Sequence, residues 1–186
     1  MHFTTTLATL SALLSAALAA PSPQYYNSAN SIRPTTLSQY KVWTGAKDYA
    51  TAEGRIYKTG RESDITTLVT FDIPQWTAGQ KCEVAFELDN SATLTGSQQF
   101  DVFTSLAPAT GPATGWPNGN LRDQFAGRAQ AYKPGRATWL PGYGYQGKFD
   151  CPAGRTMAGE LVGVNDVVEI KWNGATAGPY IIVTPA

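Results

Sequence analysis

Apolar and polar residues alternate along several short segments of this chain. A period of two places apolar side chains on one face of an extended strand, which is typical of a half-buried antiparallel strand. The pattern predicts strands within 65–73, 82–88, 99–103, 168–172 and 179–183. In the second of these segments Cys82, Val84, Phe86 and Leu88 share the apolar face. Proline and glycine turns separate the segments from one another.

The segment 121–132 fits two structures. Leu121, Phe125 and Ala129 would lie on one stripe of a helix, whereas Gly127 would interrupt a strand. We favour a strand here. Many short strands with frequent turns predict an all-β chain that folds as an antiparallel two-sheet β-sandwich, jelly-roll-like in form.

The first residues predict a secretion signal. An apolar run from Leu7 to Leu18 is too short to span a bilayer, and small residues precede Ala20, so we expect cleavage after Ala19. Residues 20–38 are rich in Pro, Ser, Asn and Thr and predict a flexible N-terminal segment. The predicted organisation is a signal peptide at 1–19, a flexible segment at 20–38 and one β-sandwich domain at 39–186.

Composition narrows the function classes. The chain carries 14 Lys and Arg against 14 Asp and Glu, so it has no net charge to attract nucleic acid or an anionic membrane. His2 is the one histidine and would leave with the signal peptide, which excludes catalytic triads and metal sites that need histidine. The "GYGYQGKF" stretch at 142–149 resembles a phosphate loop, but Phe149 stands where Ser or Thr would hold magnesium. We expect no cofactor, metal or nucleotide.

The chain has two cysteines, Cys82 and Cys151. In an oxidising compartment such a pair predicts one disulfide, and no histidine remains to activate a thiol. A bond between them would close a loop of about 70 residues, which stabilises a fold by about 4 kcal/mol in the chain-entropy model.

Aromatic residues in loop-like contexts are the candidate binding residues. Flat rings offer apolar faces to the C–H groups of sugars, so they predict a glycan platform, with burial of the same rings as the alternative. The candidates are Trp116, Trp139, Tyr143 and Tyr145. By contrast, Trp172 continues the apolar face of a strand and is predicted to lie in the core.

A glycosidase would need two carboxylates roughly 5 to 9 Å apart. Glu83 and Glu87 lie about 13 Å apart along an extended strand, which is too far. Glu160 and Glu169 could converge only through the fold. No catalytic residue is therefore assigned.

Short motifs in a fixed order resemble a known family. They are "FDIP" at 71–74, "AGQKC" at 78–82, "GSQQFDVF" at 96–103, "GNLRD" at 119–123, "CPAG" at 151–154, "DVVEIKW" at 166–172 and "GPYI" at 178–181. With the paired cysteines, this order resembles the fungal ubiquitin-three-binding protein But-two C-terminal domain family over about 64–186. The resemblance implies a secreted fungal protein of unassigned biochemistry, with no established catalytic residues to carry over.

These observations predict a secreted, non-catalytic protein at or near the fungal cell wall. Its expected partners are wall polysaccharide or an extracellular protein, and not nucleic acid, membrane or nucleotide. Two alternatives stay open. One is a small glycan hydrolase or lyase with a carboxylate pair, and the other is an interaction module for ubiquitin-like activating machinery, which the family name implies.

Overall fold

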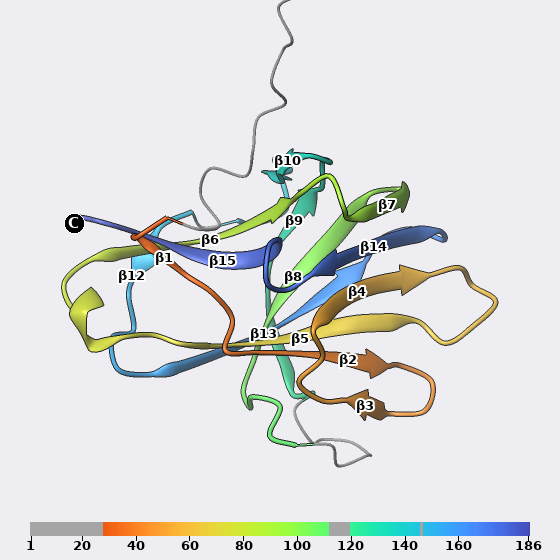
Figure 1. Cartoon of the computed structure of the whole chain (residues 1–186), viewed down its shortest axis with the longest axis horizontal. Coiled ribbons are helices and arrows are strands. Elements are labelled where there is room, and N and C mark those ends of the chain that lie inside the picture. The colour runs from red at the N-terminus through yellow and green to blue at the C-terminus, as the bar shows by residue number, and fades with distance from the viewer. Residues whose placement is uncertain (1–27, 112–119, 146) are drawn as a thin grey trace, which may run out of the picture.

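The computed structural model describes residues 28–111, 120–145 and 147–186, and in them the chain forms two antiparallel β-sheets packed as a sandwich (Figure 1). The predicted all-β sandwich is thereby confirmed. The predicted signal peptide at 1–19 and the candidate Trp116 lie outside the described residues. Within them, no helix is long and apolar enough to cross a membrane, and the one helical turn is η1 (Gln75–Thr77).

The larger sheet has the strand order β11-β9-β8-β13-β5-β4-β14-β7, with β2 pairing both β5 and β3. Its strands are β2 (Thr36–Lys41), β3 (Ala46–Asp48), β4 (Glu53–Lys58), β5 (Ile65–Asp72), β7 (Thr93–Gly96), β8 (Gln99–Ser105), β9 (Arg122–Gln130), β11 (Thr138–Trp139), β13 (Thr156–Gly163) and β14 (Val168–Asn173).

The smaller sheet has the order β1-β15-β6-β10, and β12 also pairs with β6. Its strands are β1 (Ser31–Ile32), β6 (Lys81–Leu88), β10 (Gly135–Arg136), β12 (Phe149–Asp150) and β15 (Gly178–Thr184). On the side away from β15, β12 pairs with the start of β6 and β10 with its end. The middle of that edge, around Val84, has no strand partner among the described residues.

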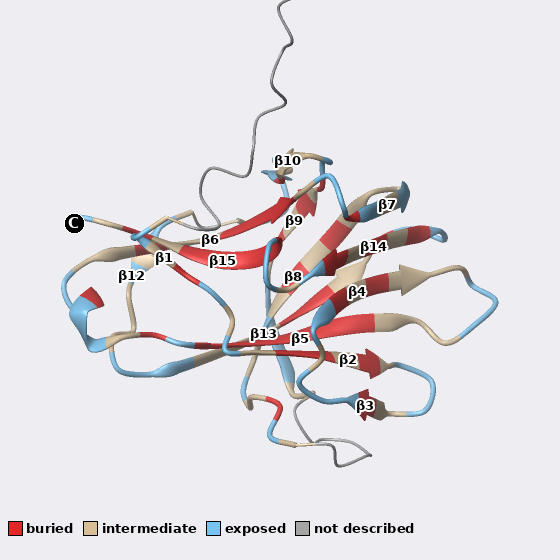
Figure 2. Ribbon diagram, viewed as in Figure 1, coloured by how far each residue is buried: buried red, intermediate tan, exposed pale blue. Residues whose placement is uncertain are grey.

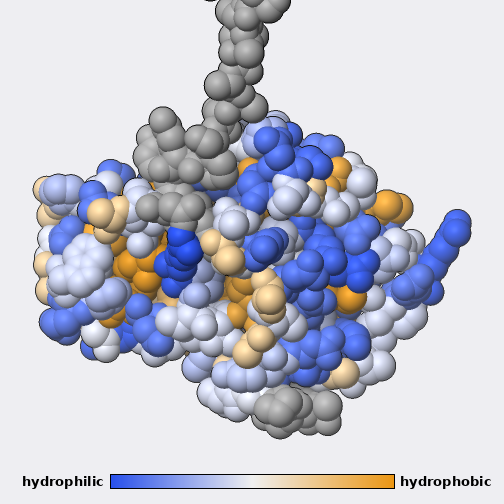
Figure 3. Space-filling view, in the orientation of Figure 1, coloured by the Kyte–Doolittle hydropathy of each residue, from blue (hydrophilic) through white to orange (hydrophobic). Residues whose placement is uncertain are grey.

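The core lies between the sheets and is built from the alternating apolar positions (Figure 2). Phe86 contacts Phe100 with ring centroids 4.7 Å apart, and it meets Trp172 edge to face at 5.1 Å. Trp172 is 1% exposed, which confirms its predicted place in the core. Figure 3 shows hydrophobic surface in limited patches among hydrophilic residues on this side of the molecule.

The disulfide is also confirmed, since Cys82 and Cys151 are bonded and their Cα atoms lie 5.0 Å apart. Cys82 lies in β6, and Cys151 directly follows β12. The bond therefore holds the segment after β12 against the edge of the smaller sheet.

Two predictions about local structure have different outcomes. Most of the segment 121–132 forms the strand β9 (Arg122–Gln130), so the favoured alternative is confirmed. The domain boundary at residue 39 is too late, because β1 and half of β2 lie within the segment predicted to be flexible. These residues resemble a polar linker in composition, but their backbones pair with β15 and β5.

Candidate functional site

Two of the four aromatic candidates, Trp139 and Tyr145, meet near Val84, beside the β6 edge that faces away from β15. Their ring centroids are 3.8 Å apart and their planes differ by 6°, so the rings stack face to face. The Tyr145 hydroxyl donates to the carbonyl oxygen of Val84 at 3.3 Å. Trp139 belongs to β11, which pairs with β9 of the larger sheet. The stacked pair thus joins the edges of both sheets.

Strand β9 is irregular where the pair packs against it. Its pairing with β8 steps from Gly127 opposite Val102 to Phe125 opposite Phe103, so Ala126 has no opposite residue. A bulge of this kind bends a strand and redirects its side chains. Gly127, at φ +152°, provides the space, because a Cβ there would lie 3.0 Å from both Trp139 and Tyr145.

A cavity of about 270 Å³ opens beside the stacked pair, and we call it the edge groove. It lies between β6 of one sheet and β8, β9 and β13 of the other. The residues that line it are mostly apolar: Val84, Val102, Thr104, Ala126, Trp139, Tyr145, Gly147, Phe149 and Met157.

A smaller cavity of about 60 Å³ adjoins the edge groove and reaches between the sheets. Five residues, among them Ala126 and Met157, line both cavities. The inner cavity also reaches Phe71, Leu161 and Ile181. The edge groove therefore continues toward the core of the sandwich.

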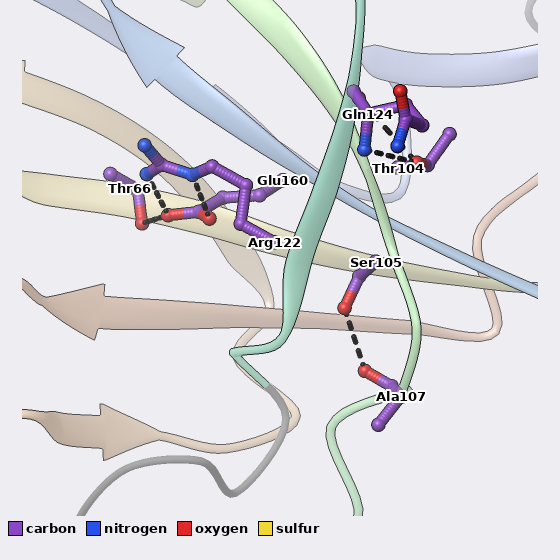
Figure 4. Close-up of polar contacts among 7 residues, drawn as sticks. All are labelled: Thr66, Thr104, Ser105, Ala107, Arg122, Gln124 and Glu160. Carbon is purple, nitrogen blue, oxygen red and sulfur yellow. Dashed lines mark hydrogen bonds and ion pairs between the residues drawn. The ribbon is translucent and has the colours of Figure 1, made fainter.

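The hydroxyl groups in the groove wall already have partners. The Thr104 hydroxyl donates to the Gln124 carbonyl at 3.4 Å and accepts from the Gln124 amide at 2.9 Å (Figure 4). The Tyr145 hydroxyl is bonded to Val84. A ligand would consequently meet a wall that offers mainly apolar contact.

The environment of Tyr145 favours its neutral form. Burial is the largest cause and the charge of Glu83 adds to it, and together they raise the pKa of Tyr145 to about 12. The guanidinium of Arg136 and the indole of Trp139 act in the opposite direction. The hydroxyl therefore remains a hydrogen-bond donor at any physiological pH.

Tyr143 lies apart from the edge groove. The guanidinium carbon of Arg128 is 4.4 Å from the centroid of its ring, and Arg128 also forms a two-bond ion pair with Asp101. The structure thus brings together only Trp139 and Tyr145 of the described candidates.

Glu160, which the sequence left open together with Glu169 as a converging carboxylate pair, is held in an ion pair with Arg122. Its carboxylate is fully buried and accepts two hydrogen bonds of 2.9 Å from Arg122 and one of 2.6 Å from Thr66 (Figure 4). The hydrogen bond to Glu160 raises the pKa of Arg122. The pair joins β9, β13 and β5, which makes it a structural contact.

The other carboxylates considered for hydrolysis also have partners of their own. Glu169 accepts two hydrogen bonds from Arg55, and Glu83 accepts one of 2.6 Å from Arg136. Glu87 accepts from the hydroxyl of Tyr180. Glu160 and Glu169 are thus bound by different arginines from different strands.

Sequence reasoning did not identify several residues of the groove. Ala126, Met157 and Phe149 carry no chemical signal, and only the bulge and the edge pairing bring them to one cavity. It also did not single out Trp43 and Trp76, two tryptophans of the described part of the chain that are 63% and 52% exposed. The Thr-Gly turn after Trp43 was the available signal for the first of these.

In the described ranges, no group of three or more His, Cys, Asp or Glu residues is placed to hold a metal ion. The model of the family described as "Ubiquitin 3 binding protein But2 C-terminal domain" matches residues 34–175. No curated protein matches the chain.

Proposed function

Because the chain belongs to the But2 C-terminal domain family, we propose that it is a non-catalytic binding module that acts outside the cell, at or near the wall. Its ligand occupies the edge groove. The family resemblance and the predicted secretion signal support a fungal source and a place at the wall.

The observation that carries this proposal is the edge groove itself. It is a concave, mostly apolar cavity with an aromatic pair in its wall, and small-molecule sites in proteins have this character. A bulge lies beside the aromatic pair and a glycine at φ +152° leaves room for it, so local backbone irregularity coincides with the cavity.

Two features support an extracellular location. The first nineteen residues have the apolar run and small residues of a cleaved signal. The bond between Cys82 and Cys151 is of the kind that persists in oxidising compartments and is rare in the cytosol.

Three of the candidate carboxylates are each bonded to an arginine, and this supports a binding role over hydrolysis. Retaining and inverting glycosidases both need two carboxyl groups that face one bond. In the described residues Glu83, Glu160 and Glu169 each accept hydrogen bonds from a separate arginine. Stacking on sugars remains a prediction for Trp139 and Tyr145, although each covers one face of the other.

The proposal is tested by expressing the full chain in a fungal host and measuring its distribution and wall binding. We expect the product to begin at residue 20 and to be retained on isolated wall material. Trp139→Ala should lower retention at least tenfold. The matched control is Trp43→Ala, because Trp43 is 63% exposed and lies outside the groove.

Two results would contradict the proposal. One is a product that keeps its leader inside the cell. The other is equal retention of the wild type, Trp139→Ala and Trp43→Ala, which would show that the groove takes no part in wall binding.

The family description favours a second candidate, an interaction module for ubiquitin-like machinery. Binding to ubiquitin-like machinery would require that some of the protein is in the cytosol. Disulfides rarely persist in that compartment. Co-purification of the activating machinery with cytosolic protein, with Cys82 and Cys151 reduced, would favour this candidate over the first.

A further inference from the structure

We propose that the edge groove binds an unbranched alkyl chain of a neutral amphiphile, with the polar head left in solvent. This inference rests on the proposed function, since it takes the groove as the binding site.

The charge of the wall is the first argument. The described residues that line the groove include no charged side chain. The charges that act on Tyr145 belong to Glu83 and Arg136, which form an ion pair of 2.6 Å with each other. A buried ion without a partner is costly, so the part of the ligand that enters is uncharged.

The engaged hydroxyls are the second argument. Thr104 is bonded to Gln124, and Tyr145 is bonded to Val84. A sugar in the groove would give up hydrogen bonds to water without gaining equivalent ones, and an unmade buried hydrogen bond costs about 1–3 kcal/mol. An alkyl chain has no hydrogen bonds to lose.

The shape of the space is the third argument. The groove of about 270 Å³ adjoins an inner cavity of only about 60 Å³, so the space narrows inward. Such a space favours a slender group. Met157 lines both cavities. Its unbranched, flexible side chain can repack as an alkyl chain passes, a use to which methionine is well suited.

The test titrates the mature, oxidised protein with methyl, hexyl, octyl and decyl glucoside, each below the concentration at which it forms micelles. These probes share one neutral sugar and differ only in the tail. We expect no measurable binding of methyl glucoside and about a fourfold gain in affinity for each added methylene until the space is filled.

Ala126→Leu fills the groove from the bulge and should lower the affinity for octyl glucoside at least tenfold. Ala175→Leu adds the same side chain at an exposed position outside the groove and should leave the affinity unchanged. Equal thermal unfolding midpoints would show that both variants are folded. As a measurement that needs no groove-filling variant, an amphiphile with a bromine on its tail should quench fluorescence in the wild type more than in Trp139→Phe.

Affinity that is independent of tail length, or absent for the whole series, would overturn the inference. So would equal quenching in the wild type and Trp139→Phe. These results are separate from the wall experiment: tail-dependent binding without wall retention would contradict the wall function alone, and wall retention lost in Trp139→Ala without tail-dependent binding would contradict the alkyl ligand alone.

Discussion

Gly127 is the residue on which the aromatic wall of the edge groove depends. Its φ of +152° disfavours other residues, and an added Cβ would lie 3.0 Å from both Trp139 and Tyr145. Tyr145 in turn donates a hydrogen bond from its hydroxyl to the carbonyl oxygen of Val84, so its protonation state and its place in the wall are linked.

Gly127→Ala should therefore cost stability and displace the aromatic pair. Gly142→Ala is the matched control, because Gly142 also has a positive φ, of 83°, but has nothing within 4 Å of an added Cβ. We expect Gly127→Ala to lower the free energy of unfolding by about 1–3 kcal/mol more than the control, as overpacking does. Urea unfolding followed by tryptophan fluorescence measures this, and equal losses in the two variants would refute the packing argument.

The raised pKa of Tyr145 predicts a loss of stability in alkali. The pKa is about 12 in the fold against 10.0 for the unperturbed side chain, so the neutral form is stabilised by folding. The contribution of neutral Tyr145 to the free energy of unfolding is complete below pH 10 and is lost as the pH rises from 10 to 12. The free energy of unfolding should fall less steeply over that window in Tyr145→Phe than in the wild type, and parallel profiles would contradict the assignment.

Among the strands, the contact of Arg122 with Glu160 ties the outer face of the larger sheet together. Arg122 reaches from β9 across the ring of Phe103 in β8, 4.6 Å away, to Glu160 in β13, where Thr66 of β5 also donates. Three strands thus bond at one fully buried carboxylate, and the fourth, β8, contributes the ring that Arg122 crosses.

Arg122→Ala should destabilise the protein by about 2 kcal/mol, less than for a fully buried pair because the Arg122 side chain is 40% exposed. The loss comes from leaving the Glu160 carboxylate without its cation. The control is Lys171→Ala, since Lys171 pairs with Glu53 at 2.9 Å on the surface and should contribute less than about 1 kcal/mol. Chemical denaturation compares them, and equal losses would contradict a structural role for the buried pair.

At the scale of the whole molecule, the disulfide and the groove are coupled through one short segment. Cys151 is bonded to β6, and Phe149, two residues before it, lines the groove. Breaking the bond therefore acts on the global stability of the sandwich and on the position of one groove wall.

Replacing both Cys82 and Cys151 by alanine should lower the free energy of unfolding by about 4 kcal/mol, the chain-entropy value for a separation of 69 residues. Reductant should lower the urea midpoint of the wild type and leave that of the double variant unchanged. A wild-type midpoint insensitive to reductant, with both thiols shown to be free, would contradict this prediction.

Local sequence determined much of the framework. Alternation in 65–73, 82–88 and 168–172 was enough to predict β5, β6 and β14. Successive side chains of a strand point to opposite faces, so a period of two places the apolar residues on one face. Two cysteines together with a predicted secretion signal were enough to predict the disulfide. At 31–41 composition misled, because the three apolar residues that β1 and β2 bury, Ile32, Leu37 and Tyr40, are spread among polar ones, and the backbone pairing of these strands leaves no mark on composition.

Tertiary structure alone decided where the candidate site lies. Trp139 and Tyr145 were selected from the sequence as aromatic loop residues, but their stacking depends on the bulge at Ala126 and on the pairing of β11 with β9. Likewise, only packing between strands far apart in the chain brought Arg122 and Thr66 within hydrogen-bond distance of Glu160. Periodicity is a local property that each segment carries by itself, whereas a cavity and a buried ion pair exist only where segments far apart in the chain meet.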